Sequence, residues 1–215
     1  MSLRVSEIFS SIQGESSLAG WPCTFVRLSG CNLRCAYCDT RYAYEEGEWL
    51  DLAQILDRVA AFRCPLVELT GGEPLLQQET PQLIRNLLDL GHTVLLETNG
   101  SMDVSMADAR CVKIVDFKCP SSGESDSTDL RNVSRLQGHD EAKLVIATRE
   151  DYEFAKGITD LIRRQCGPAS TINFSPVFGM LPASELAAWI LEDRLHVRLN
   201  LQLHKYIWDP DRRGV

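Results

Sequence analysis

The chain has 215 residues, of which 44% are hydrophobic and 24% charged, the balance of an ordinary soluble globular protein. This length predicts one domain over 1–215, and no apolar run approaches the ~20 residues that span a membrane. The formal net charge of −8 argues against a broad nucleic-acid-binding surface. The first ten residues lack the apolar core of an export signal, so we expect a cytoplasmic protein with free or metal-bound cysteines.

Short apolar runs and amphipathic segments follow one another along the chain and predict strands and helices in turn. Residues 3–12 alternate only weakly, whereas 24–28 alternate as a strand does, with Arg27 on the face opposite Val26 and Leu28. The later elements are expected at 52–62 (helix capped by Asp51 and Gln54), 65–70 (strand), 80–90 (helix begun by Thr80 and Pro81, ended by Gly91), 92–98 and 112–118 (strands), about 129–137 (helix), 142–147 (strand), 149–165 (helix), 172–175 (strand), 184–193 (helix) and 197–203 (strand). The polar loop 120–127 is expected to be the most flexible segment.

Strands separated by helices predict right-handed βαβ units and a parallel sheet. About six units fit this length, whereas a full eight-unit barrel typically needs about 250 residues. We therefore expect an incomplete, TIM-like (β/α)6 barrel. Chemistry in such folds lies at the carboxyl ends of the strands. Polar or cysteine-rich segments follow the predicted strands at 31–38, 71–74, 97–100, 118 and 175–176.

Three cysteines, Cys31, Cys35 and Cys38, are spaced three residues and then two on one loop. Thiolates in such a cluster suit iron–sulfur or zinc chemistry. A structural zinc site would need a fourth ligand. More distant residues could supply it, namely Cys64, Cys111, Cys119 or a histidine. Unrelated core thiols seldom crowd so closely. The spacing favours an iron–sulfur cluster with one open metal position.

The sequence CNLRCAYC resembles the cluster loop of radical S-adenosylmethionine (radical SAM) enzymes, including the aromatic Tyr37 before the last cysteine. Gly71-Gly72-Glu73 resembles the family's GGE motif, which holds the methionyl amino group of SAM. The resemblance implies that the three cysteines bind a 4Fe–4S cluster whose fourth iron binds SAM. It also implies the incomplete barrel and an external electron donor of the flavodoxin or ferredoxin type.

The resemblance also suggests which residues hold SAM. They are Tyr37, Gly71, Gly72, Glu73, Thr98, Lys118 and Ser121. Each has an ordinary alternative: the glycines suit any strand-to-helix turn, Glu73 suits a helix N-terminus, and Lys118 could be a surface charge.

Segments 9–15, 20–27, 38–40 and 201–208 together resemble the 7-carboxy-7-deazaguanine synthase family, almost from end to end. This resemblance implies a radical ring contraction that converts 6-carboxy-5,6,7,8-tetrahydropterin to 7-carboxy-7-deazaguanine, with loss of ammonia, on the route to deazapurines such as queuosine. Magnesium and a homodimer are further implications. The plain CxxxCxxC loop lacks an insertion that some relatives carry, and the role of the tail at 209–215 is left open.

For that substrate the resemblance points to six binding residues. They are Gln13, Gly14, Glu15, Arg27, Gln202 and His204. Gln13 and Glu15 can hydrogen-bond a pterin edge, and the Arg27 guanidinium can clamp the substrate carboxylate as a fork. Thr40 offers magnesium the oxygen ligand that this ion prefers. Gln202 and His204 would share one face of the last strand.

Two other classes of function remain open at this stage. A glycyl-radical-enzyme activating enzyme also has a CxxxCxxC loop and a short barrel, but would act on a partner protein. A non-enzymatic iron–sulfur or zinc protein would bind no SAM.

Overall fold

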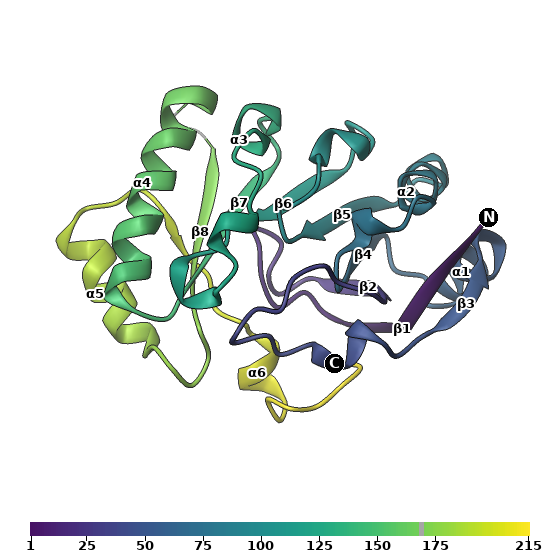
Figure 1. Cartoon of the computed structure of the whole chain (residues 1–215). Helices are drawn as coiled ribbons and strands as arrows, with labels where there is room; N and C mark the ends of the chain where they lie inside the picture. Colours follow the sequence, from purple (N-terminus) through teal and green to yellow (C-terminus); the bar gives the residue numbers. More distant parts are fainter. Residues whose placement is uncertain (168–169) are drawn as a thin grey trace.

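A mostly parallel sheet of nine strands organises the chain (Figure 1). The computed structural model describes residues 1–167 and 170–215. The strands are β1 (Ser2–Ile12), β2 (Pro22–Leu28), β3 (Glu48–Asp51), β4 (Leu66–Gly71), β5 (Thr93–Thr98), β6 (Val112–Asp116), β7 (Glu141–Ile146), β8 (Thr171–Pro176) and β9 (Arg198–Leu199). Their spatial order is β3-β1-β2-β4-β5-β6-β7-β8-β9, parallel from β2 to β9 and antiparallel for β1 against β2 and β3.

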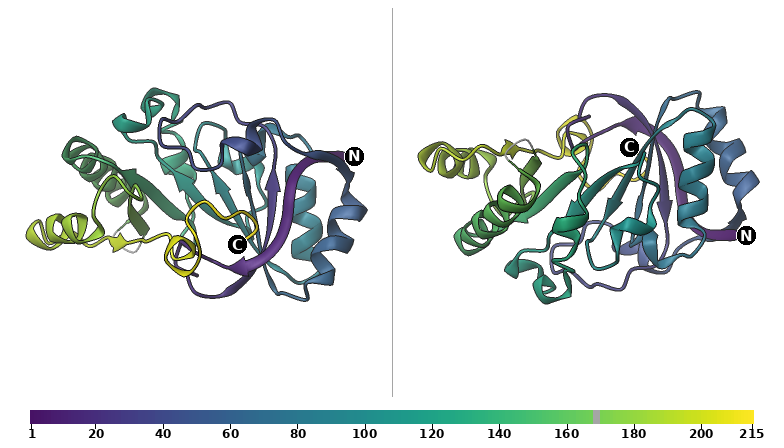
Figure 2. Two further views of the ribbon diagram at one scale, coloured as in Figure 1. Left: turned by 90° about the horizontal axis from the view of Figure 1, so that it is seen from below. Right: turned by 90° about the horizontal axis from the view of Figure 1, so that it is seen from above.

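Helices connect most of the parallel strands. They are α1 (Leu52–Ala61), α2 (Thr80–Asp89), α3 (Asn132–Arg135), α4 (Arg149–Cys166), α5 (Ala183–Glu192) and α6 (His204–Ile207). Of these, α1 to α5 lie where the sequence pattern predicts helices. Asp51 and Gln54 form the predicted capping box of α1. Only the 3₁₀ turn η3 (Val104–Met106) stands between β5 and β6, and α3 is a single turn. The prediction of an incomplete barrel of six units is confirmed: the sheet stays open between its edge strands (Figure 2).

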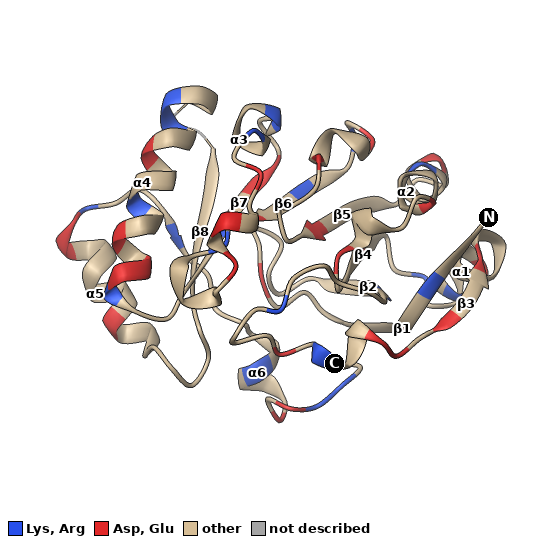
Figure 3. Ribbon diagram, in the orientation of Figure 1, with Lys and Arg blue, Asp and Glu red and all other residues tan. Residues whose placement is uncertain are grey.

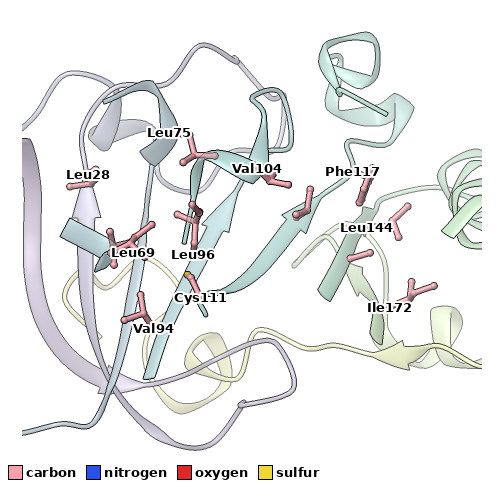
Figure 4. Packing of buried hydrophobic residues seen from close by; sticks show 14 of the residues in the cluster. Leu28, Leu69, Leu75, Val94, Leu96, Val104, Cys111, Phe117, Leu144 and Ile172 are labelled. Atoms are coloured by element: carbon pink, nitrogen blue, oxygen red, sulfur yellow. The ribbon is translucent and has the colours of Figure 1, made fainter. Parts of the chain in front are cut away.

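The face of the sheet that the helices cover, which we call the outer face, carries the main hydrophobic core. Side chains such as Leu28, Leu69, Leu96, Leu144 and Ile172 alternate with inner-face neighbours along their strands and are almost fully buried there (Figure 4). Complete burial of one such side chain contributes roughly 1.5–3 kcal/mol. All strands of the described chain share this sheet, and the single domain over 1–215 stays a prediction.

The opposite face of the sheet, the inner face, is polar toward the carboxyl ends of the strands. Its polar residues are Arg27, Glu68, Thr70, Glu97, Asp116, Lys143 and Ser175. At the amino ends a small apolar cluster around Phe25, Leu95 and Ile114 fills the same face. Strands of a parallel sheet are usually apolar on both faces. The polar half of the inner face therefore indicates a site rather than a core.

A β-bulge between Val5 and Glu7 explains why residues 3–12 alternate only weakly. Val5 pairs with Leu28 and is buried in the outer core, whereas Glu7 pairs with Arg27. The extra residue in the bulge turns Glu7 to the inner face although it lies two positions from Val5.

The structure corrects the predicted last strand. The pattern at 197–203 suggested a full strand, but β9 covers only Arg198–Leu199, and His204 begins α6. The chain leaves the sheet because Leu203 N donates to Gly14 O at 2.9 Å, which draws this segment across to the turn after β1. The alternation in the sequence therefore continues past the end of the strand.

Two smaller predictions concern local structure. The loop at 120–127 forms the turns η4 (Pro120–Ser122) and η5 (Ser125–Ser127), and Ala36 N donates to Ser122 O at 2.9 Å, while its flexibility stays a prediction. The second prediction is wrong. Thr80 does not cap α2 but begins it, and its hydroxyl donates to Pro74 O at 2.6 Å.

Replacement of Leu96 by alanine tests the outer core. Leu96 is fully buried, so Leu96→Ala should lower the free energy of unfolding by about 2–5 kcal/mol. Leu191→Ala is the control, because Leu191 is 76% exposed and should change it by less than about 0.5 kcal/mol. Urea unfolding of the iron-free proteins measures both, and equal effects would contradict this placement of the core.

Candidate active site

A cavity of about 860 Å³ opens at the carboxyl ends of the parallel strands. It gathers most of the residues that the sequence singled out. Those that line it are Gln13, Gly14, Glu15, Arg27, Cys31, Cys35, Tyr37, Cys38, Thr40, Gly71, Gly72, Thr98, Lys118, Gln202 and His204. Glu73 and Ser121 are not in its lining. Most of the site residues predicted from the sequence therefore line one cavity, and two of them lie outside its lining.

The cysteine loop follows β2 and forms one wall of the cavity. Cys31, Cys35 and Cys38 are free and half-buried. Burial raises the pKa of Cys35, and the neighbouring Asp116 carboxylate adds to this effect. A bound iron would reverse the shift, because metal coordination deprotonates a thiol.

The cysteines proposed as a fourth zinc ligand lie away from this loop. Cys64 is buried at the amino end of β4 and donates to Pro22 O at 3.2 Å. Cys111 is buried before β6, and Cys119 is buried in the outer core. Among residues 1–167 and 170–215, no three His, Cys, Asp or Glu side chains are grouped to hold a single metal ion. The donor set fits a cluster with three protein thiolates.

Gly71 and Gly72 bring the end of β4 against the start of the cysteine loop. A Cβ on Gly71 would overlap the Leu28 backbone, and its φ of +135° also favours glycine. A Cβ on Gly72 would overlap Gly30 O. The glycine pair therefore sets the position of Cys31 as well as leaving room at the cavity.

The Glu73 side chain is fully buried and is not part of the cavity lining. Its carboxylate accepts hydrogen bonds from Leu75 N at 2.9 Å, Asn99 N at 2.7 Å and Thr98 Oγ1 at 2.9 Å. Burial raises its pKa, although these donors act in the opposite direction. The carboxylate joins the end of β4 to the end of β5, and the prediction that it binds SAM directly stays a prediction.

Asp116 and Lys118 lie near the cysteine loop at the end of β6. Lys118 Nζ donates to Asp116 Oδ2 at 2.6 Å, so Lys118 is not a free surface charge. Although burial disfavours the ammonium, Asp116 raises the pKa of Lys118. Asp116 Oδ1 is buried without a partner. Ser121 lies outside the lining, where its amide donates to Asp151 Oδ1 at 2.8 Å.

The segment after β1 forms the floor of the cavity. Gln13 Nε2 donates to Glu68, and Gln13 Oε1 accepts from Glu15 N at 3.1 Å. Burial raises the pKa of Glu68 well above its usual range, with the Glu97 charge adding to the shift. The His204 ring lies against Gly14, where a Cβ would overlap Nδ1. A side chain at position 14 would therefore displace the His204 ring from its position.

Lys143 is the cation at the centre of the floor. Its ammonium pairs with Glu15 and, at 2.6 Å, with Glu97 Oε1. Although burial disfavours the charged amine, these two carboxylates raise the pKa of Lys143. Glu97 also accepts from Thr70 Oγ1 at 3.3 Å. Glu15 Oε1 is buried without a partner.

Arg27 projects from the inner face of β2 and is held by Glu7. The Arg27 Nε–Glu7 Oε1 distance is 2.7 Å, and Tyr42 OH donates to the same oxygen at 2.8 Å. Only Nε is used in this ion pair, so the two Nη groups are left to bind another acceptor, as the proposed carboxylate clamp requires.

Asp39 connects the cysteine loop to the carboxyl-terminal segment. It pairs with Lys205 Nζ at 2.6 Å and accepts from Gln202 Nε2 at 3.3 Å and Thr40 Oγ1 at 2.9 Å. Although burial opposes ionisation, the ion pair with Lys205 lowers the pKa of Asp39. Burial lowers the pKa of His204, which favours its neutral form.

The tail that follows α6 lines the mouth of the cavity from Pro210 to Val215. Arg213 pairs with Glu46 at 2.9 Å and its guanidinium lies 3.7 Å from the centroid of the Tyr42 ring. Figure 1 shows this yellow segment ending beside the early part of the chain. The sequence left the role of this tail open, and in the structure it lines the cavity.

Comparison with known proteins gives the family. A model of the radical SAM superfamily matches residues 25–115. The 7-carboxy-7-deazaguanine synthase of Chlorobaculum tepidum is 50% identical, over 99% of this chain and 97% of its own length. This chain belongs to the 7-carboxy-7-deazaguanine synthase family. The protein of the same name from Koribacter versatilis is 45% identical over 99% of this chain and its own full length (100%). Both recognitions made from the sequence are thereby confirmed, and superfamily membership implies a 4Fe–4S cluster and SAM.

Two solved structures share the fold. The crystal structure of QueE from Escherichia coli has a TM-score of 0.72 at 20% identity and covers 95% of each chain. The structure of TYW1 with a lysine-pyruvate adduct has a TM-score of 0.54 at 14% identity and covers 79% of this chain and 72% of that one. At these identities the likeness concerns the fold alone.

The sequence analysis missed several residues that line the cavity. Thr70, Asp116 and Lys143 lie on inner-face positions of parallel strands. Glu97 shares this face, and the sequence placed it only as the first residue of the segment 97–100 at a strand end. The signal was present, since each is a polar residue at alternate positions in an otherwise apolar run. Glu68 occupies another such position and was missed as well.

We predict that only Cys31, Cys35 and Cys38 are needed to hold the cluster. Replacement of any one by alanine should remove most of the iron after anaerobic reconstitution, because an open-site cluster has no spare protein ligand. Cys64→Ala and Cys111→Ala are controls at the far ends of the strands and should keep it. Iron analysis and absorption spectra report the result; one tightly bound zinc without iron would refute the cluster.

Replacement of Glu73 separates a structural from a direct role. Glu73→Ala leaves three buried donors without an acceptor, at roughly 1–3 kcal/mol each, so the free energy of unfolding should fall markedly. Affinity for SAM should fall about tenfold or more, with the iron content unchanged. Glu73→Gln is the control that keeps one acceptor oxygen and should be milder in both measurements. Unchanged affinity for SAM in Glu73→Ala would make this turn merely structural.

Proposed function

We propose that this protein is a radical SAM enzyme that converts 6-carboxy-5,6,7,8-tetrahydropterin to 7-carboxy-7-deazaguanine and ammonia by ring contraction. The observation that carries the proposal is that full-length similarity to this family coincides with a single cavity that joins a cysteine loop to a polar floor. The product belongs to the route to deazapurines such as queuosine.

The two ends of the chain support this assignment. Gln13 and Glu15 follow β1, Arg27 lies in β2 and His204 begins the last helix, yet all four line one cavity. Placement of Arg27 and His204 on opposite sides of the molecule would have argued against a shared substrate pocket. Instead, the lining offers a carboxylate clamp and a set of ring-edge acceptors within one space.

When bound, the cluster and SAM supply the deoxyadenosyl radical that begins the reaction. Cys31, Cys35 and Cys38 would hold the cluster, and the strand ends around Gly72 and Thr98 would hold SAM. The chain contributes orientation: Arg27 binds the substrate carboxylate, and Glu15 anchors the ring so that its C6 hydrogen faces the radical. Precise placement is where such an enzyme gains rate. The tail at 210–215 lines the cavity and would limit the access of water to it.

Magnesium is part of the proposal through Thr40. Its hydroxyl lines the cavity beside the Asp39 carboxylate, at an Oγ1–Oδ1 distance of 2.9 Å. These are the hard oxygen groups that magnesium prefers, and the substrate carboxylate would complete the set. Asp39 is already engaged by Lys205, which leaves Thr40 as the proposed direct ligand.

Several expectations accompany the proposed function. The electron donor, of the flavodoxin or ferredoxin type, would approach the exposed edge of the cysteine loop, where Asn32, Arg34 and Ala36 are exposed. Figure 3 shows Lys and Arg interspersed with Asp and Glu along the ribbon, and we expect no direct role for nucleic acid. None of the helices in the described ranges could span a membrane. A cytoplasmic homodimer is our expectation for this enzyme.

Family membership disfavours the two alternatives from the sequence. A glycyl-radical-enzyme activating enzyme would act on a peptide segment, and the floor of buried carboxylates around Lys143 suits a small polar heterocycle better. A non-enzymatic zinc or iron–sulfur protein would have no use for the unpartnered acceptors Glu15 Oε1 and Asp116 Oδ1.

The decisive experiment is anaerobic incubation of cluster-loaded protein with SAM, magnesium, a reductant and the carboxytetrahydropterin. We expect the absorption spectrum of 7-carboxy-7-deazaguanine to appear and ammonia to be released. With substrate deuterated at C6, label should enter deoxyadenosine or SAM. Absence of the deazapurine from protein that cleaves SAM would contradict the proposed substrate.

Replacement of Thr40 tests the metal. Thr40→Ala should lower turnover and weaken its response to added magnesium, because one oxygen ligand is lost. Thr93→Ala is the matched control, since Thr93 is exposed at the amino end of β5. The effect is measured as the rate of turnover at increasing magnesium concentration. If turnover of the wild type did not depend on magnesium, the proposed role of the metal would be wrong.

A further inference from the structure

The side chain of Asn99 lies between the end of β5 and the cysteine loop. Asn99 is buried, and its Nδ2 donates to Cys31 Sγ at 3.7 Å and to Asn32 Oδ1 at 3.1 Å. The backbone amide of Leu33 donates to the same sulfur at 3.4 Å. Cys31 therefore receives two N–H groups, one from its own loop and one from a neighbouring strand end.

The orientation of the Asn99 side-chain amide is fixed by its neighbours. Ser101 N can only donate, and it lies 3.0 Å from Asn99 Oδ1. The amide oxygen must therefore face Ser101, which leaves the N–H groups of Nδ2 for Cys31 and Asn32. The main chain is held as well, because Asn99 N donates to the buried Glu73 carboxylate at 2.7 Å. Asn99 is thus a donor that is held in place before any cluster is bound.

Donors of this kind alter the reduction potential of an iron–sulfur cluster. Reduction adds one electron, which makes the cluster and its thiolate ligands more negative. An N–H group that points at a ligand sulfur stabilises the added charge, so it favours the reduced state and raises the potential. Removal of such a donor should lower the potential.

We propose that the Asn99 side chain raises the reduction potential of the cluster by donating a hydrogen bond to the Cys31 sulfur. Asn99 acts through Cys31, and this role requires no contact with SAM or with the substrate. The inference rests on the cluster that superfamily membership implies and is independent of the identity of the substrate. A higher potential makes it easier for the external electron donor to reduce the cluster.

The test is an anaerobic redox titration of cluster-loaded protein without SAM or substrate, followed by the electron paramagnetic resonance signal of the reduced cluster. Asn99→Ala removes the donor. At a fixed solution potential its ratio of reduced to oxidised cluster should be about tenfold below that of wild type, a shift of about 59 mV for one electron. Asn99→Asp keeps the acceptor oxygen for Ser101 but replaces the donor with a second oxygen, so it should lower the potential at least as much.

Ser101→Ala is the matched control. It removes the hydroxyl that donates to Asn99 Oδ1 at 2.6 Å but keeps both the Ser101 amide and the Asn99 donor. Its potential should therefore equal that of wild type. Iron analysis shows how much cluster each variant holds.

An unchanged potential in either Asn99 variant would overturn the inference. A potential in Ser101→Ala as low as that of Asn99→Ala would also overturn it, because the cause would then be a general loosening of the loop. Loss of iron from both Asn99 variants would do the same, since a residue that only tunes the cluster is not needed to hold it. Absence of deazapurine formation in wild type would instead overturn the proposed function, because the titration uses no substrate.

Discussion

The pairing of one buried lysine with two carboxylates is the interaction on which the site depends. Lys143 holds Glu15 from the first connection and Glu97 from the end of β5. A buried ammonium without partners is strongly destabilising. If one of the three segments moved away, a buried charge would lose its partner, so the ion pairs hold the segments in place. The neighbouring bond from Ser17 N to Glu141 Oε1, at 3.1 Å, fastens the same connection to β7. These contacts join the segment after β1 to the inner face of the sheet and form the floor of the cavity.

The opposite wall is built by close approach of backbones rather than by charge. Gly71 and Gly72 let the end of β4 approach Leu28 and Gly30, which places the first cysteine. Glu73 then fixes Thr98 and Asn99 through buried hydrogen bonds. A residue that a motif marks as a ligand can thus act by orienting the chain around a cofactor. In this protein the carboxylate is fully engaged by the chain itself.

The mouth of the cavity is made by the two ends of the chain. Asp39 on the cysteine loop pairs with Lys205, and Tyr42 lies between Glu7 and Arg213. Exposed ion pairs such as Arg213–Glu46 contribute little to stability. Their value here is placement, since they keep the tail over the cavity. A chain of contacts from Arg213 through Tyr42 and Glu7 reaches Arg27, so the position of the tail bears on the proposed carboxylate clamp.

The sequence by itself determined most of the order of strands and helices, the open barrel and the cysteine loop, because these follow from local periodicity and close spacing. It did not predict the strand β3 or the helix α6. It could locate Arg27 on the inner face, since a regular strand alternates. The bulge at Val5–Glu7, the short β9 and the hydrogen-bonded loop at 120–127 were decided only by tertiary contacts. So was the floor: Glu15, Glu97 and Lys143 are far apart in the chain, and no local pattern pairs them. The partners of a charged residue in a parallel sheet become evident only in the folded structure. There the low polarity of the interior requires each buried charge to be paired.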